Sequence, residues 1–303
     1  MKLNNMKLMM LFVAMALTAA CNATPSATSD PALSPGQAPQ TIEQIEEQPQ
    51  TEVVAVKSQK MGRDINATVV VPAQYFDPDL QEEQFPVVYL LHGADGSYRD
   101  WPTKADLDDL SSEYGVIIVC PDGQDSWYFD SPIDPKMQFE TFITQELVAF
   151  IDSHYRTLPE RKFRAITGLS MGGHGALWCA WRHTDVYGAC GAMSGGVDIS
   201  QFPDRWNIHK RLGAYADNKQ RWIDHSVITL VPTLKNGQQA IIIDDGAEDF
   251  FYKVNCQLHD ALLKHKIGHD FTIRPGNHSW TYWINSLDYH MLFFAKYFSV
   301  DQE

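Results

Sequence analysis

The sequence contains little basic charge and few cysteines. Its 24 lysines and arginines are outnumbered by 38 aspartates and glutamates, which gives a formal net charge of −14 over 303 residues. Proteins that bind nucleic acids need basic side chains to replace the counterions of the phosphates, so we expect no nucleic-acid partner. Only five cysteines occur, and a chain long enough to bury a large core does not need them as disulfide staples.

Two further absences narrow the possible functions. The sequence has no H-E-x-x-H motif or similar cluster of metal ligands, which argues against a metal-dependent deacetylase. We therefore expect neither a metal nor a cofactor. No apolar run reaches the length that is needed to cross a bilayer.

The N-terminus resembles a bacterial export signal. Lys2 and Lys7 precede the apolar segment 8–20, and L-T-A-A-C at 17–21 is similar to the lipobox of bacterial lipoproteins. We predict that residues 1–21 are a lipoprotein signal peptide with Cys21 as the lipidation site; the alternative is an ordinary cleaved signal peptide. The protein would then be an exported lipoprotein, periplasmic or on the cell surface, that contacts the membrane only through its N-terminal lipid.

The next segment, residues 22–52, is rich in Pro, Ser, Thr, Ala, Gln and Glu. Such a composition cannot bury enough apolar surface to fold, so we predict a disordered tether with a reach of roughly 30 Å. The four remaining cysteines fall in apolar or helical patterns, and we expect buried free thiols, although an exported protein can form disulfides. These are Cys120, Cys179, Cys190 and Cys256.

From residue 53 onward, short apolar runs alternate with helical patterns. Continuous apolar runs are typical of strands covered on both faces, and apolar residues at three-and-four spacing indicate helices with one buried face. The predicted strands cover residues 53–58, 67–71, 86–91, 115–120, 163–167, 188–193, 239–244 and 271–274. The predicted helices cover residues 138–155, 171–183, 250–265 and 280–298.

This alternation predicts one α/β domain over residues 53–303, a three-layer sandwich with a mostly parallel central sheet of about eight strands. The first two strands have no helix between them and should pair antiparallel. Residues 199–236 follow neither period. We interpret them as an insertion over the carboxyl edge of the sheet.

A serine lies in a glycine-rich turn between a predicted strand and a predicted helix. The segment T-G-L-S-M-G-G-H-G at 167–175 contains the pattern G-x-S-x-G, in which Gly168 and Gly172 leave room for a strained turn that exposes the hydroxyl of Ser170. A serine hydroxyl needs a base to remove its proton. We predict that Ser170 is a nucleophile; the alternative is a serine that merely caps the helix.

The acid that would support such a nucleophile is expected on a loop after a later strand. The segment D-D-G-A-E-D at 244–249 offers four carboxylates, Asp244, Asp245, Glu248 and Asp249. The first two close the predicted strand, whereas Asp249 follows the turn at Gly246. We predict Asp249 as the acid; the alternative is an N-cap of the following helix.

The histidine should come last in the chain order. Of eleven histidines, only His278, in R-P-G-N-H-S-W, lies in a loop after the last predicted strand. We therefore predict His278 as the general base. Five others fall in predicted helices and are interpreted as packing or surface residues: His174, His183, His259, His265 and His290.

Acyl transfer also needs backbone N–H groups that face the developing oxyanion. The segment L-H-G-A-D-G-S at 91–97 directly follows a predicted strand. Its glycine turn would present the N–H of Ala94, and the N–H of Met171 would be the second donor. His92 is interpreted as a residue that fixes this loop.

Together these motifs resemble the putative esterase family of α/β-hydrolases. The segments that carry the resemblance are L-H-G-A-D-G-S (91–97), P-D-G (121–123), E-L-V-A-F-I-D (146–152), R-A-I-T-G-L-S-M-G-G (164–173), D-D-G-A-E-D (244–249) and G-N-H-S-W (276–280). The resemblance covers about residues 53–299 and implies the α/β-hydrolase fold, with Ser170 as nucleophile, Asp249 as acid and His278 as base. That family includes S-formylglutathione hydrolases, acetyl esterases, feruloyl and acetylxylan esterases, and mycolyltransferases.

The export signal disfavours a cytosolic S-formylglutathione substrate. We predict a serine carboxylesterase that removes acetyl or feruloyl groups from a polysaccharide or oligosaccharide. Trp101, Trp127 and Trp280 are candidates for contact with this substrate, and Trp206 lies on another loop expected near the nucleophile. Core packing is an equal alternative for each. Three other functions stay open: an acyltransferase of the same fold, a general short-chain esterase, and a non-catalytic glycan-binding lipoprotein.

Overall fold

The computed structural model describes residues 49–299. The predictions for the signal peptide, for Cys21 and for most of the tether lie outside the described residues. Strand β1 begins at Thr51, so the folded part starts two residues earlier than the predicted boundary at residue 53. No helix among residues 49–299 is long and apolar enough to span a membrane.

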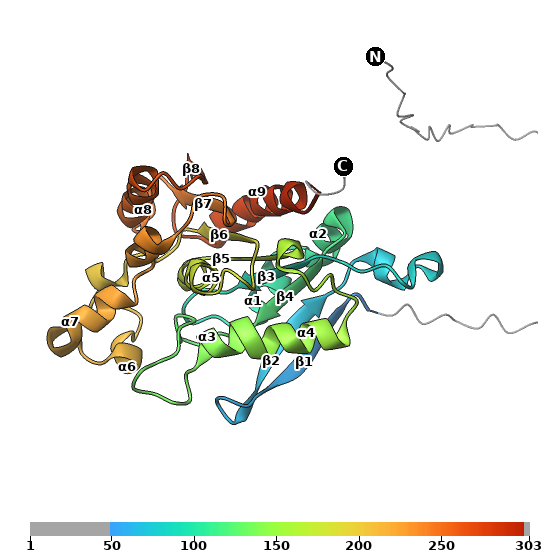
Figure 1. Ribbon diagram of the computed structural model, residues 1–303, viewed down its shortest axis with the longest axis horizontal. Coiled ribbons are helices and arrows are strands. Elements are labelled where there is room, and N and C mark those ends of the chain that lie inside the picture. Colours follow the sequence, from blue (N-terminus) through green and yellow to red (C-terminus); the bar gives the residue numbers. More distant parts are fainter. Residues whose placement is uncertain (1–48, 300–303) are drawn as a thin grey trace, which may run out of the picture. The chain divides into compact units, whose positions relative to one another are not determined.

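A single sheet of eight strands forms the centre of the described residues (Figure 1), in the order β1-β2-β4-β3-β5-β6-β7-β8. β1 pairs antiparallel with β2, and β2 pairs antiparallel with β4, while the other neighbours are parallel. The fold prediction is confirmed, including the antiparallel first pair. The strands are β1 (Thr51–Ser58), β2 (Arg63–Val70), β3 (Val87–Leu91), β4 (Ile117–Pro121), β5 (Arg164–Gly168), β6 (Ala189–Met193), β7 (Ala240–Gly246) and β8 (Asp270–Arg274).

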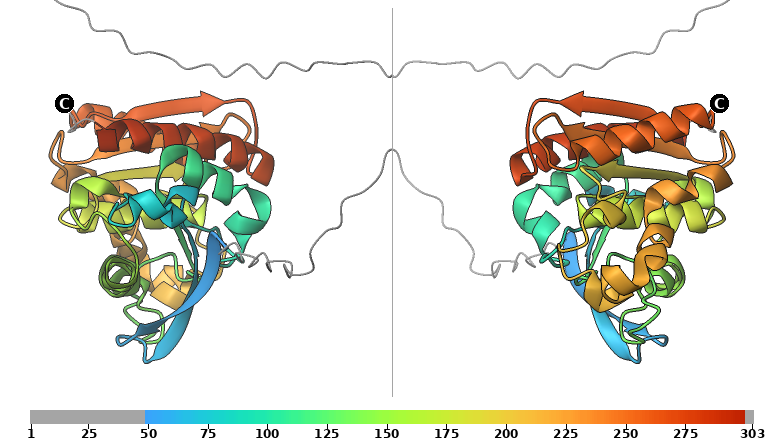
Figure 2. Two further views of the ribbon diagram at one scale, coloured as in Figure 1. Left: turned by 90° about the vertical axis from the view of Figure 1, so that its right-hand side faces the viewer. Right: turned by 90° about the vertical axis from the view of Figure 1, so that its left-hand side faces the viewer.

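The central strands divide their side chains between two apolar cores. In β3, Val87, Tyr89 and Leu91 face one core, and Val88 and Leu90 face the other. All five are buried, as the period of two in a strand with both faces covered requires. Figure 2 shows how the strand direction turns from β1–β2 towards β7–β8, which is the usual twist of such a sheet.

Helices cover both faces of the sheet and make a three-layer sandwich (Figure 1). One core includes side chains of α4, α5 and α8, and the other includes side chains of α1, α2 and α9. The α-helices are α1 (Asp100–Lys104), α2 (Leu107–Tyr114), α3 (Phe139–Thr141), α4 (Leu147–His154), α5 (Met171–Arg182), α6 (His209–Leu212), α7 (Tyr215–Asp224), α8 (Tyr252–Lys264) and α9 (Trp280–Ser299).

Several helical regions differ from the sequence prediction, and the short helix α1 is one that was not predicted. The predicted helix 138–155 is interrupted by a π-helical turn at Phe142–Glu146 between α3 and α4. Helix α2 was not predicted, because its eight residues carry few apolar side chains. Its ends are nevertheless marked: the side chain of Asp106 accepts a hydrogen bond from the N–H of Asp109, and Gly115 closes the helix at φ 60°.

The predicted insertion, residues 199–236, contains α6, α7 and two 3₁₀ turns, η5 (Ile199–Gln201) and η6 (Val227–Thr233). Its first part contacts the segment that follows the carboxyl end of β7: Phe202 lies against Phe251, and Trp206 lies against Phe250. This agrees with the predicted position over the carboxyl edge of the sheet.

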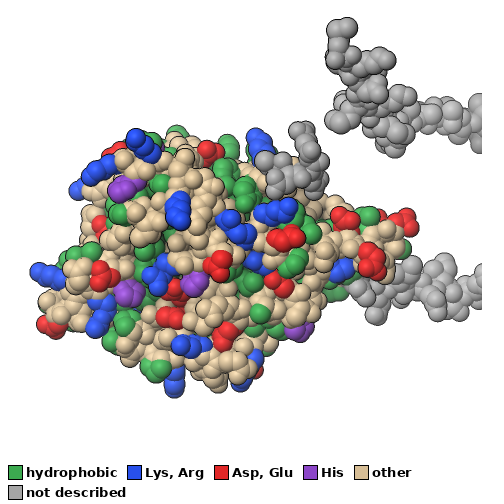
Figure 3. Space-filling model, viewed as in Figure 1, with side chains coloured by type: hydrophobic (Ala, Val, Ile, Leu, Met, Phe, Trp, Pro, Cys, Tyr) green, Lys and Arg blue, Asp and Glu red, His purple; other side chains and the backbone are tan. Residues whose placement is uncertain are grey.

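The four cysteines of the described domain are free, as predicted. Cys120, Cys179 and Cys190 are buried, whereas Cys256 is partly exposed, contrary to the expectation of burial. Burial raises the pKa of the Cys190 thiol to about 12, so this thiol is unreactive at neutral pH. On the surface shown in Figure 3, basic and acidic side chains are interspersed.

Candidate active site

Ser170 lies at the tight turn between β5 and α5. Its φ of 56° and ψ of −115° are unusual for a residue with a side chain, and such strain is found where the surrounding structure holds a functional group in place. Close packing explains the two glycines of the motif. A Cβ at Gly172 would lie 2.5 Å from the carbonyl oxygen of Leu91 and 2.6 Å from that of His92. The turn therefore fits only if position 172 has no side chain.

The loop after β3 lies directly beside this turn. A Cβ at Gly93 would lie 3.4 Å from the Cβ of Ser170. Within residues 49–299, no group accepts a hydrogen bond from the N–H of Ala94 or Met171, and the N-terminal end of α5 adds positive potential. Both predicted oxyanion donors are thus unpaired at the edge that carries Ser170.

His92 fixes this loop, as interpreted from the sequence. Its Nδ1 lies 2.7 Å from the carbonyl oxygen of Gly93, and its Nε2 accepts a hydrogen bond of 2.8 Å from the N–H of Gly123. Since Nε2 accepts, the proton is assigned to Nδ1 and the ring is neutral. Both ring nitrogens are occupied, so His92 has none left for a second base.

Ser170, His278 and Asp249 are connected by two hydrogen bonds. The Oγ of Ser170 lies 2.9 Å from Nε2 of His278, and Nδ1 of His278 lies 2.8 Å from Oδ2 of Asp249. With the proton on Nδ1, the ring donates to the carboxylate and accepts from the serine hydroxyl. The side chain of Asp249 is fully buried and that of His278 is 16% exposed, so their ion pair would be little screened by solvent.

Backbone contacts hold the acid and histidine loops together. The N–H of Ala247 donates to the carbonyl of Arg274 at 2.8 Å, and the N–H of Glu248 donates to that of Gly276 at 2.9 Å. These two bonds join the end of β7 to the loop after β8. Asp249 and His278 therefore meet because neighbouring parallel strands end at the same edge of the sheet.

The other three carboxylates of the segment 244–249 have different surroundings. Asp244 is paired with Arg274 at 2.5 Å, Asp245 accepts hydrogen bonds from the N–H of Gly246 and the amide of Asn255, and Glu248 is exposed. Asp249 also accepts a 2.8 Å hydrogen bond from the N–H of Phe251 through its second oxygen. It thus makes both the contact expected of an acid and the cap-type contact of the alternative interpretation.

Asp245 is a buried carboxyl group that interacts electrostatically with Asp249. Desolvation by burial and the nearby charge of Asp249 raise its pKa to about 8. The raised pKa favours the neutral form of Asp245, because burial and a neighbouring carboxyl both disfavour a charge there.

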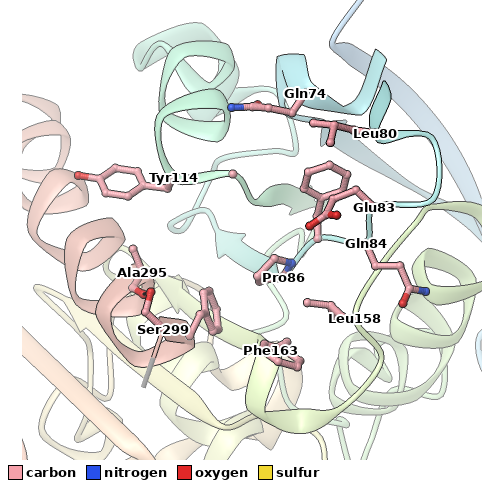
Figure 4. Close-up of a pocket in the computed structure, with 13 residues that line it drawn as sticks. Gln74, Leu80, Glu83, Gln84, Pro86, Tyr114, Leu158, Phe163, Ala295 and Ser299 are labelled. Carbon is pink, nitrogen blue, oxygen red and sulfur yellow. Dashed lines mark hydrogen bonds between the residues drawn. The ribbon is translucent and has the colours of Figure 1, made fainter. Parts of the chain in front are cut away.

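A cavity of about 390 Å³ lies at the other edge of the sheet (Figure 4). Its lining includes Pro86, Gly115 and Phe163, which precede β3, β4 and β5. Ser170 follows the carboxyl end of β5, so this cavity is not part of the Ser170 site. Among the described residues, no three His, Cys, Asp or Glu side chains gather in a group that could hold a metal ion.

A model of the family described as "Putative esterase" matches residues 58–294. This chain belongs to that esterase family. Family membership places it among the carboxylic ester hydrolases, and the α/β-hydrolase fold is shared with the solved structures of esterases.

Three relatives of the esterase illustrate the similarity. An acetyl esterase of Caldicellulosiruptor saccharolyticus is 28% identical over 226 residues, 70% of this chain and 84% of that protein. An S-formylglutathione hydrolase of Rattus norvegicus is 26% identical over 251 residues, 74% of this chain and 88% of that protein. The solved structure of a ferulic acid esterase aligns with a TM-score of 0.70 at 27% identity, covering 83% of this chain and 100% of that one.

The esterase buries two of the three tryptophans that were predicted to contact substrate. Trp101 and Trp127 are each 1% exposed. The indole N–H of Trp101 donates to the carbonyl of Leu91 at 3.0 Å, and Trp127 packs against His174. Neither ring offers a face to a substrate, so their assignment is corrected to core packing. Trp280 is partly exposed at the start of α9 and stays a candidate.

One aromatic side chain beside His278 was not predicted as a functional residue. Phe250 directly follows Asp249, is 52% exposed, and lies 4.2 Å from His278 between ring centroids. Its position in the sequence next to the predicted acid could have indicated that Phe250 lies near the active site. An apolar residue at the start of a predicted helix, however, is ordinarily interpreted as a buried one.

Proposed function

We propose that this esterase cleaves carboxylic esters with Ser170 as nucleophile, His278 as general base and then acid, and Asp249 as the carboxylate that orients His278. The observation that carries this proposal is the pair of hydrogen bonds, 2.9 Å and 2.8 Å, that connect the three side chains. The unpaired N–H groups of Ala94 and Met171 support it, because they lie where an oxyanion would form.

In the first half of the reaction, His278 takes the proton of Ser170 as Oγ forms a bond to the ester carbonyl carbon. The carbonyl oxygen becomes an oxyanion that the N–H groups of Ala94 and Met171 stabilise. The bond to the alcohol oxygen then breaks, and that oxygen receives the proton from His278. In the second half, His278 activates a water that attacks the acyl-enzyme, which releases the acid and restores Ser170.

The proposed substrate is an acetyl or feruloyl ester of a polysaccharide or oligosaccharide. Similarity to an acetyl esterase and to a ferulic acid esterase supports this substrate class. The predicted export signal supports it further, because an exported protein meets polymers and their fragments.

A panel of esters tests the substrate class. We expect release of acetate from acetylated xylan or of ferulate from arabinoxylan, with a kcat/KM at least about tenfold above that for tributyrin. Acid release is quantified by chromatography, with an added sugar acceptor to detect transfer. Preference for tributyrin would identify a general short-chain esterase, transfer in place of free acid would identify an acyltransferase, and glycan binding without turnover of any ester would contradict esterase activity.

We also propose that Cys21 carries lipid and anchors the exported esterase. In a bacterial host, the full chain should fractionate with membranes and incorporate labelled fatty acid, whereas Cys21→Ala should lose the label and the anchoring. Cys256→Ala, a substitution in the folded domain, is the control and should leave the fractionation unchanged. Membrane association without label in the wild-type chain would contradict lipidation.

A further inference from the structure

An exposed phenylalanine beside His278 stacks on a partly exposed tryptophan. Phe250 is 52% exposed, and its ring centroid lies 4.2 Å from that of His278. Trp206, from the insertion, is partly exposed and stacks on Phe250 with 5.8 Å between ring centroids and 25° between the ring planes. We call Phe250 and Trp206 the aromatic ledge.

Buried neighbours hold the ledge in place. Phe251 is 1% exposed, and its ring centroid lies 4.6 Å from that of Phe250 and 5.2 Å from that of Trp206. Trp206 and Asn207 have φ values of 50° and 54°, a left-handed conformation that costs a residue with a side chain about 1–2 kcal/mol. Such conformations persist where surrounding contacts impose them and gather at ligand sites.

Exposed apolar side chains that occur singly on a surface need no explanation. The ledge differs because its two rings come from segments far apart in the sequence and stack on each other, with Phe250 exposed and Trp206 partly exposed. One of them also contacts the ring of the proposed general base. An ester that reacts at Ser170 therefore comes within reach of the ledge.

The reaction geometry decides which half of the ester reaches it. Nε2 of His278 must give its proton to the leaving alcohol oxygen, so that oxygen lies within hydrogen-bond reach of the ring that Phe250 flanks. The carbonyl oxygen faces the N–H groups of Ala94 and Met171 instead, in the loop after β3 and at the start of α5. The alcohol half of the ester is thus the part next to the ledge.

We infer that the aromatic ledge binds a sugar ring in the alcohol half of the ester. A sugar ring has a flat face of C–H groups and a rim of hydroxyls. Stacking on the ledge removes the apolar face and the exposed aromatic surface from water and leaves the rim hydrated. This inference rests on the proposed function and deepens it, because it assigns the specificity for the alcohol to Phe250 and Trp206.

The test compares esters that differ in one half at a time, with the full chain as enzyme. The substrates are methyl ferulate and feruloyl arabinose, which share an acyl group, and methyl acetate and acetylated xylobiose, which share another. We expect Phe250→Ala to lower kcat/KM for the sugar esters about tenfold, chiefly through KM, and for the methyl esters less than twofold. Trp206→Ala should show the same pattern.

Two variants serve as controls. Phe250→Tyr keeps an aromatic ring and should retain the preference for sugar esters. Tyr252→Ala removes a ring that is 39% exposed two residues along the chain and should leave all four rates unchanged.

Three outcomes for Phe250→Ala would overturn the inference. An equal loss of kcat/KM on methyl and sugar esters would mean that Phe250 acts through His278. A loss of kcat/KM that depends on the acyl group, or no loss at all, would also contradict it. In each case the wild-type enzyme still hydrolyses esters and the proposed function stands. A wild-type enzyme that cleaves none of the four esters would contradict the proposed function itself.

Discussion

The Ser170→Ala variant is expected to lose nearly all esterase activity, with kcat at least about 10⁴-fold lower. The substitution removes the oxygen that forms the acyl-enzyme, while the oxyanion N–H groups and the substrate contacts remain. KM should change little for the same reason. The measurement is the release of p-nitrophenol from p-nitrophenyl acetate, with circular dichroism to show that the variant is folded.

Asp249→Asn tests the role of the carboxylate that orients His278. An asparagine has the shape of the aspartate but can present an N–H to Nδ1 of His278, which favours the wrong tautomer of the ring. We expect a fall in kcat of about 10⁴-fold.

The matched control for Ser170→Ala is Ser153→Ala, at an exposed position of α4, which should keep full activity. Retention of more than about 1% of wild-type activity by Ser170→Ala would refute the assignment.

Asp245→Asn should make the stability of the esterase much less dependent on pH. The pKa of Asp245 is raised by burial from 3.8 to about 8. Its contribution to stability is therefore fully present below about pH 4 and is lost as the pH rises through 8. Since one pKa unit corresponds to about 1.4 kcal/mol, the wild-type protein should lose on the order of 3 kcal/mol more than the variant between pH 5 and pH 8.

Urea unfolding at a series of pH values measures this effect. The asparagine also perturbs the hydrogen bond with Asn255, but that cost is the same at each pH and shifts the whole curve without changing its slope. Asp260→Asn, at an exposed position of α8, is the control and should follow the wild-type curve. Parallel curves for the wild-type protein and Asp245→Asn would show that Asp245 is ionised throughout this range.

The strands and the nucleophile turn were predictable because their signals are local. A run such as Val87–Leu91 is short and apolar at every position, as is typical of a strand covered on both faces. The G-x-S-x-G pattern is recognisable within five residues, although the contacts that require its glycines come from the end of β3 and the loop after it. Helix α2 was missed because eight residues with a thin apolar stripe give a weak periodic signal, and its formation depends on packing against α9.

For the active site, the sequence predicted only the order in which the serine, the acid and the histidine follow one another along the chain. Order along the sequence selected His278 and the segment 244–249, and the structure brings His278 and Asp249 within hydrogen-bond distance of one another. The pairing of Asp244 with Arg274 and of Asp245 with Asn255 was not visible in the sequence. Those contacts join residues from different elements, so they depend on how the strands and helices pack.

By itself, the sequence determined the esterase family, the strand-turn-helix around Ser170 and the order of its two partners, because short sequence patterns and the order of the strands carry this information. Only the tertiary structure decided that Trp101 and Trp127 are buried, that Phe250 is exposed beside His278, and that Trp206 stacks on Phe250. The reason is that the exposure of an aromatic ring is set by neighbours from distant parts of the chain, and no local pattern records them.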